Sequence, residues 1–165
     1  MEGRLYHESQ TIMPKMTAFV AALLCTGTVA FTMYASVGTG EIDLASASGI
    51  MLMATLAITL LLTFVLFILR INITVEYGLL TVGIFKGRRI PMNEIHSVAQ
   101  ENFSALKDYL GWGIKVGRKG LGYIAAGTNS GLRINLKEGR SFFISSKRTF
   151  EFESAMKTAL RSIKE

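Results

Sequence analysis

The sequence predicts an α+β chain that is mainly β. A two-helix transmembrane hairpin comes first, followed by a seven-stranded β-barrel or sandwich with a C-terminal helix capping it. Three observations predict this fold class. Residues 17–37 and 49–69 contain no charged side chain. From residue 70 onward, apolar and polar residues alternate between frequent turn signals, as in half-buried strands. From residue 149, apolar residues recur at helical spacing.

The two uncharged runs predict membrane-spanning helices. Each run has 21 residues, so as a helix it would extend about 31 Å, close to the roughly 30 Å hydrocarbon core of a bilayer. Neither run contains proline or a residue that is charged at neutral pH, which favours an anchor over a transport path. The Ala-Ser-Ala at 45–47 loosely resembles a signal-peptide cleavage site. It lies well beyond the first apolar run, so cleavage is the less favoured alternative.

The basic residues predict the orientation of this hairpin. Arg4 and Lys15 precede the first run and Arg70 follows the second, whereas the connecting segment has neither Lys nor Arg. The positive-inside rule therefore places both termini in the cytoplasm. The predicted segments are a cytoplasmic tail (1–16), a first span (17–37), an external loop (38–48), a second span (49–69) and a cytoplasmic domain (70–165).

Charge also divides the chain into two regions. The 165 residues carry a formal net charge of +6. Residues 1–69 hold two basic and four acidic side chains, a net −2, and residues 70–165 hold 16 basic and eight acidic ones, a net +8. This asymmetry is typical of a chain that combines two regions of different kinds.

The region after residue 70 predicts strands joined by short turns. Ile71, Ile73 and Val75 alternate with polar residues, which indicates a half-buried strand. The connector at 103–110 is ambiguous, and "KGRR" at 86–89 is a predicted turn. The seven predicted strands are 71–77, 79–85, 93–102, 112–116, 122–127, 132–137 and 141–146.

A helix is predicted to follow the last strand. Thr149 is its expected N-cap, and Glu151 and Glu153 suit the positive end of the helix dipole. Because one face is apolar, the helix is expected to cover an open end of the strand region. The residues of the apolar stripe are Phe152, Ala155, Met156, Ala159, Leu160 and Ile163.

Residues 108–156 resemble the bacterial pleckstrin-homology-like domain family, whose members follow one or two transmembrane helices. The matching positions are a G-W-G-I-K strand (111–115), an aromatic residue (Tyr123), G-L-R-I-N-L (131–136), G-R-S-F (139–142) and a basic pair (147–148). Thr149 replaces the proline expected at the helix start. The resemblance covers roughly residues 70–163 and the hairpin before them. It implies a non-enzymatic, membrane-tethered interaction module in the bacterial inner membrane.

Two groups of side chains are candidate sites. The glycine-rich segment 111–131 resembles a phosphate-binding loop, but alternating strands follow each of its turns, which favours hairpin construction. Its basic turn at 118–119 and the turn at 86–89 form a candidate site for anionic lipid headgroups. The alternative is that these basic residues are ordinary solvated charges on loops. Phe142 and Phe143 are neighbours on opposite faces of a strand, so one is expected to be either covered by the helix or partly exposed, and an exposed ring is a candidate partner contact. The candidate lipid-binding residues are Lys86, Arg88, Arg89, Arg118 and Lys119.

The expected function is therefore a membrane-anchored scaffold that binds a membrane or cytoplasmic protein, with homo-oligomers as a further option. The alternative is a sensor of anionic phospholipid. An oligomeric channel or transporter subunit is a third, less favoured class. No catalytic residue, metal or cofactor is expected, and nucleic acid is not an expected partner because no aromatic and basic face is evident.

Overall fold

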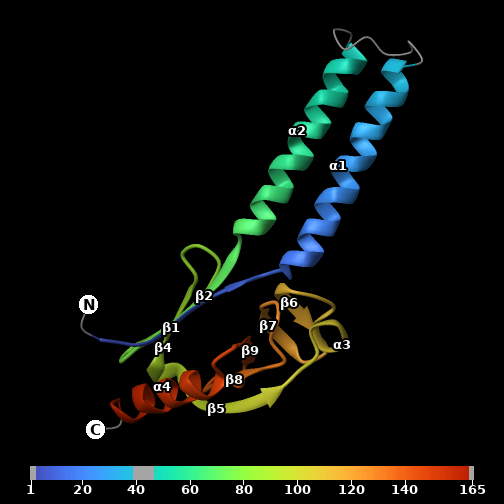
Figure 1. The fold of residues 1–165 in the computed structure, drawn as a ribbon. Helices are drawn as coiled ribbons and strands as arrows, with labels where there is room; N and C mark the ends of the chain where they lie inside the picture. The colour runs from blue at the N-terminus through green and yellow to red at the C-terminus, as the bar shows by residue number, and fades with distance from the viewer. Residues whose placement is uncertain (1–2, 39–46, 164–165) are drawn as a thin grey trace. The chain divides into compact units, whose positions relative to one another are not determined.

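The computed structural model describes residues 3–38 and 47–163, which fall into two compact units (Figure 1). The strand-rich unit consists of residues up to Met13 together with those from Leu69 onward. The helical unit consists of residues from Pro14 to Ile68. The helical unit is therefore an insertion in the sequence of the strand-rich unit.

The helical unit contains two helices that pack against each other, α1 (Lys15–Gly38) and α2 (Ala47–Ile68). Their threonine hydroxyls donate to carbonyls one turn earlier, as Thr26 does to Ala22 (2.7 Å) and Thr59 to Thr55 (2.8 Å). These bonds satisfy the hydroxyls without a partner outside the helix.

The prediction of two membrane spans is supported in part. Within the described residues, one helix, Lys15–Ser36, is long and apolar enough to cross a bilayer. The apolar segment of α2, Gly49–Val65, is shorter, at about 26 Å of helix. Most of the predicted external loop (38–48) lies outside the described residues.

Sheet A is antiparallel, in the order β1 (Arg4–Thr11), β2 (Arg70–Glu76), β3 (Leu79–Gly83), β4 (Arg88–Pro91). Two of these strands were not predicted. β4 begins inside the predicted turn at 86–89 and extends beyond it to Pro91, and β1 lies in the segment predicted as a tail. The inward positions of β1 include Glu8 and Gln10, so it lacks the apolar alternation by which strands are recognised.

Sheet B has the order β5 (Ile95–Asn102), β8 (Ser130–Leu136), β9 (Ser141–Ser145), β7 (Gly120–Ile124), β6 (Gly113–Gly117). Its pairs are antiparallel except β7 with β9, which is parallel. A 3-10 turn, η1 (Met92–Glu94), joins the two sheets, and the connector before β6 contains the short helix α3 (Ala105–Tyr109). The described chain thus has nine strands in two sheets where seven were expected.

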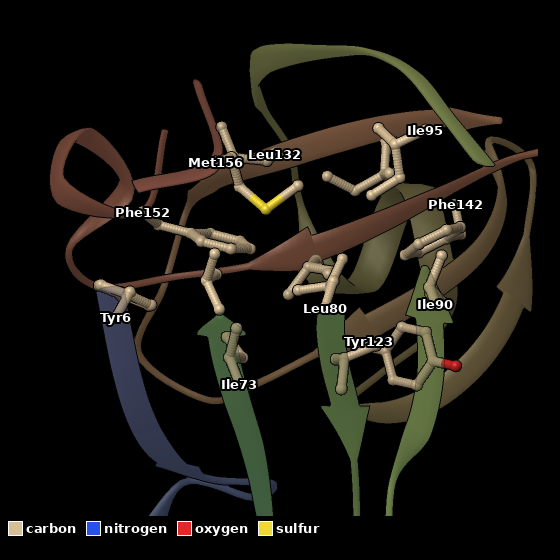
Figure 2. Close-up of a cluster of buried hydrophobic side chains, with 14 of the residues drawn as sticks. Tyr6, Ile73, Leu80, Ile90, Ile95, Tyr123, Leu132, Phe142, Phe152 and Met156 are labelled. Carbon is tan, nitrogen blue, oxygen red and sulfur yellow. The ribbon is translucent and has the colours of Figure 1, made fainter. Parts of the chain in front are cut away.

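The main core lies between the two sheets and α4 (Thr149–Arg161). Phe152, Met156 and Ala159 of the predicted apolar stripe are fully buried, which confirms that α4 covers the strands. Ile163 is exposed, and the N-cap is Arg148 rather than Thr149. Figure 2 shows the side chains that meet in this core, including Ile73, Leu80, Ile90, Ile95, Leu132, Phe142, Phe152 and Met156.

A second, smaller cluster consists of Phe103, Tyr109, Ile124 and Phe143, with Trp112 against it. Phe143 alternates along β9 with Phe142 and Ile144 of the main core, so this cluster occupies the other face of sheet B. The connector at 103–112 covers that face.

Glycines make this covering possible. A Cβ at position 117 would lie 2.1 Å from the Asp108 carbonyl oxygen, and one at position 122 would lie 2.6 Å from the Tyr109 ring. The glycine-rich segment therefore serves close packing and hairpin turns.

Candidate functional site

Both phenylalanines predicted as a partner contact are buried. Phe142 is 2% exposed and Phe143 is 0% exposed, so the prediction that one ring is available to a partner is wrong. Phe142 packs edge-on against Tyr123 in the main core, and Phe143 lies 4.8 Å from the Phe103 ring, centroid to centroid. Both rings are buried because the main core packs on one face of β9 and the connector at 103–112 packs on the other.

The exposed apolar side chains of the strand-rich unit lie elsewhere. They include Phe85 in the turn between β3 and β4, Leu110 after α3, Val116 on β6 and Phe150 on α4. Phe85 and Leu110 lie in a turn and just after a short helix, where periodicity assigns no face, whereas Phe150 lies off the predicted apolar stripe of α4.

The five basic residues predicted as one site belong to two hairpins on different sheets. Lys86, Arg88 and Arg89 lie in the turn between β3 and β4 and on the first residues of β4. Arg118 and Lys119 form the turn between β6 and β7. All five are exposed. The structure divides the predicted site into two candidate surfaces.

The second of these turns is occupied by internal ion pairs. The Lys119 ammonium lies 2.8 Å from a Glu101 carboxylate oxygen and 3.5 Å from an Asp108 carboxylate oxygen. Arg133 donates to the same Glu101 at 2.9 Å and to the Lys119 carbonyl at 2.6 Å. Lys119 therefore fastens the β6–β7 turn to β5 and to the α3 connector.

The protonation of these groups fits that role. Partial burial acts to raise the pKa of Glu101, but hydrogen bonds from Lys119 and Arg133 outweigh it and hold the pKa below its ordinary value. The backbone N–H of Ser104, followed by nearby Lys119, lowers the pKa of Asp108. The hydrogen bond to Glu101 raises the pKa of Lys119. Near neutral pH the two carboxylates, Glu101 and Asp108, are balanced by two cations, Lys119 and Arg133.

The first turn is built differently. The Gly87 N–H donates to the Ile84 carbonyl at 3.3 Å, which closes a tight turn with Phe85 and Lys86 at its tip. Phe85 has a φ of 57°, in the left-handed region that a bulky residue adopts at a cost of about 1–2 kcal/mol. The residue is 86% exposed. The segment 84–91 contains no acidic residue.

This turn lies at the end of sheet A where the chain connects to the helical unit. Asn72, the third residue of β2, pairs with Gly83, the last residue of β3, so the turn lies at the end of the sheet where β2 begins. Thr11, the last residue of β1, pairs with Arg70, the first of β2. The Ile12 N–H then donates to the Leu69 carbonyl at 3.3 Å. Both connections therefore leave the sheet at one place, beside the turn.

Sequence reasoning missed a buried carboxylate near the middle of β1. Glu8 is 7% exposed and accepts hydrogen bonds from the Tyr6 hydroxyl, the Ser146 hydroxyl (2.6 Å) and the Lys147 N–H (3.1 Å). Burial and the neighbouring Glu8 raise the pKa of Tyr6. Arg148 reaches across to the His7 carbonyl at 2.6 Å. This network ties β1 to the segment that begins α4.

Within residues 3–38 and 47–163, no three His, Cys, Asp or Glu side chains gather as a metal site would require. An open hollow of about 380 Å³ adjoins α4 and is lined by Leu5, Phe150, Glu151, Ser154, Ala155 and Thr158. Comparison of the chain with family models, curated proteins and solved structures found no match.

Proposed function

We propose that the protein is a membrane-anchored, non-enzymatic interaction module, with the helical unit as anchor and the strand-rich unit as a pleckstrin-homology-like binding domain. One observation carries the proposal. The chain leaves sheet A after Thr11 and returns at its pairing partner Arg70, through two apolar helices. An apolar insertion between paired strands attaches a folded domain at a single point.

The helix surfaces support membrane insertion. Large apolar side chains such as Phe31 and Tyr34 on α1, and Leu61 and Phe64 on α2, are exposed in the described structure. Monomeric soluble proteins rarely expose apolar surface of this extent, whereas lipid-facing helices require it. Since α2 has 22 residues in all, it extends about 33 Å. We therefore propose that it crosses the bilayer as α1 does.

The basic residues support the orientation. Lys15 begins α1 and Arg70 follows α2, and basic residues next to spans favour the cytoplasmic side. The proposal places the strand-rich unit and both termini in the cytoplasm of a bacterial cell, at its inner membrane.

An exposed sheet edge supports the binding role. β6 is the last strand of sheet B in the described topology, and its Ile114 and Val116 are exposed. An unpaired edge with apolar side chains can add a strand from another chain. The expected occupant is an extended segment of a membrane or cytoplasmic protein, or a second copy of this chain.

The single cysteine tests the anchor. Cys25 lies on α1 and is exposed in the described structure, so a surrounding bilayer would protect it. In membranes that contain the full chain, a hydrophilic maleimide is expected to leave Cys25 unmodified until the protein is denatured in sodium dodecyl sulfate. Rapid modification in intact membranes, or release of the protein by alkaline carbonate, would refute the anchor.

A matched variant tests the orientation. Glu138→Cys with Cys25→Ser moves the only thiol to an exposed turn of the strand-rich unit. It is expected to react in inside-out vesicles and to stay unmodified in intact cells. The reverse pattern would place the unit outside.

Recognition of anionic lipid is a second candidate function, and the first basic turn favours it. Lys86, Arg88 and Arg89 are exposed at the end of sheet A that carries both helix connections. Each basic residue near an anionic bilayer contributes about 1 kcal/mol of attraction. In full-length protein reconstituted with anionic lipid, hydrogen exchange at residues 84–89 is expected to slow, and salt is expected to reverse this. Equal exchange in neutral and anionic bilayers would exclude lipid recognition by this turn.

A further inference from the structure

The turn between β3 and β4 combines an apolar tip with a basic base. Phe85 at the tip is 86% exposed, and Lys86 follows it. Arg88 and Arg89 begin the next strand, and the Arg88 guanidinium lies 5.9 Å from the centroid of the Phe142 ring, which holds it near the base of the turn. Lipid interfaces bind this combination, since an aromatic ring enters the acyl-chain boundary while basic groups meet phosphates.

Position distinguishes Phe85 from the other exposed phenylalanine of the strand-rich unit. Phe85 lies beyond the Asn72–Gly83 pair, at the end of sheet A where only Leu69 separates β2 from α2. Phe150 has similar exposure (81%) but lines a hollow with Leu5, which is near the opposite end of β1. The two side chains thus provide a site and its control within one fold.

Charge distinguishes this turn from the other basic hairpin. Segment 84–91 contains no Asp or Glu, so its three positive charges have no acidic neighbour within the hairpin. Lys119 of the β6–β7 turn is instead paired with Glu101 and Asp108. Anionic headgroups complement the first turn, whereas Lys119 of the second turn is already paired with carboxylates of the same unit.

We infer that the β3–β4 turn is an interfacial lipid-binding element. Phe85 inserts at the acyl-chain boundary of the same bilayer that holds the helices, and Lys86, Arg88 and Arg89 contact anionic headgroups. Arg118 and Lys119 take no part. This inference rests on the proposed membrane anchor and adds to it a specific lipid contact made by the strand-rich unit.

Tryptophan fluorescence tests the insertion. In full-length protein with Trp112→Phe, a Phe85→Trp variant is reconstituted in vesicles of phosphatidylcholine and phosphatidylglycerol. Its emission is expected to shift to the blue and to lose intensity when the acyl chains are brominated. Phe150→Trp in the same background is the matched control, and it is expected to show neither effect. Adding Arg88→Glu and Arg89→Glu is expected to reduce the quenching of Phe85→Trp.

A second measurement keeps the test valid if Trp112→Phe impairs folding. With Trp112 retained, Phe85→Asp is expected to abolish the anionic-lipid protection of residues 84–89 from hydrogen exchange, whereas Phe150→Asp leaves it intact. Red-shifted, unquenched emission from Phe85→Trp overturns the inference. If Cys25 in those same vesicles stays protected from maleimide, the membrane anchor stands. If Cys25 reacts, the anchor fails as well.

Discussion

The buried carboxylate of Glu8 gives the sharpest test of how β1 is held. Glu8→Gln preserves the shape of the side chain but removes its charge and replaces one acceptor oxygen with a donor. The amide nitrogen cannot accept, so Gln loses either the bonds from the Tyr6 and Ser146 hydroxyls, which both donate to one oxygen of Glu8, or the bond from the Lys147 N–H. If the hydroxyl bonds are lost, the two hydroxyls, 3.1 Å apart, can form one hydrogen bond to each other.

The expected loss follows from this change in hydrogen bonding. Hydrogen bonds to a charged group contribute about 1.5–3 kcal/mol each. With charged hydrogen bonds lost and only neutral ones in their place, the free energy of unfolding should fall by about 2–5 kcal/mol. At an m-value of about 2 kcal/mol per molar urea, the midpoint should move down by about 1–2.5 M.

Trp112 provides the assay. It is the only tryptophan in the chain and packs against the second cluster of the strand-rich unit, so its fluorescence in detergent-solubilised full-length protein reports unfolding of that unit. Glu138→Gln, at an exposed turn, is the control and should stay within about 0.5 kcal/mol of the parent. If Glu8→Gln behaves like this control, the network does not hold β1 and the reasoning is refuted.

Three further outcomes can be measured with the same urea assay. Phe143→Ala should lower the free energy of unfolding by about 3–5 kcal/mol because it empties a fully buried site, whereas exposed Phe150→Ala should change it by less than about 0.5 kcal/mol; equal effects would contradict the burial of Phe143. Gly117→Ala should cost about 1–3 kcal/mol because its Cβ meets backbone at 2.1 Å, while Gly78→Ala, with nothing within 4 Å, should be tolerated; a tolerated Gly117→Ala would show that the connector does not pack there. Because the pKa of folded Glu101 lies below its ordinary 4.5, its carboxylate stabilises the fold above about that pH, and this contribution disappears as pH falls through the lowered pKa. Glu101→Gln should therefore lower the midpoint at pH 7 and converge with the parent in acid, and a pH-independent difference would count against the ion pairs.

Local pattern predicted those elements whose inward residues are apolar. Ile71, Ile73 and Val75 identified β2, and Phe152 with Met156 identified α4, because burial of apolar side chains is what periodicity records. β1 could not be found in this way. Its inward residues include Glu8 and Gln10, whose burial depends on partners near the far end of the sequence, at 145–147.

The candidate site was less predictable than the fold for a related reason. The exposure of Phe143 depends on whether the connector at 103–112 folds over sheet B, which no alternation within β9 reveals. Likewise, Lys119 and Lys86 look equivalent in sequence, and only tertiary structure places Glu101 and Asp108 beside the former. The sequence supplies the charges, and the pairing of strands determines which of them stay free.

The placement of β1 changes how the two units must be separated. A boundary drawn after the second apolar run, at residue 70, would remove a whole edge strand and with it Tyr6 and the Glu8 network. β2, which carries Ile71, Ile73 and Val75, would lose the strand that pairs with one of its edges. The Lys147 N–H would lose its acceptor. Because Thr11 and Arg70 are paired, joining them through a two-residue Asn-Gly turn preserves the antiparallel register. The helical unit thus occupies the position of a hairpin loop, and the strand-rich unit depends on both sides of that loop for its core.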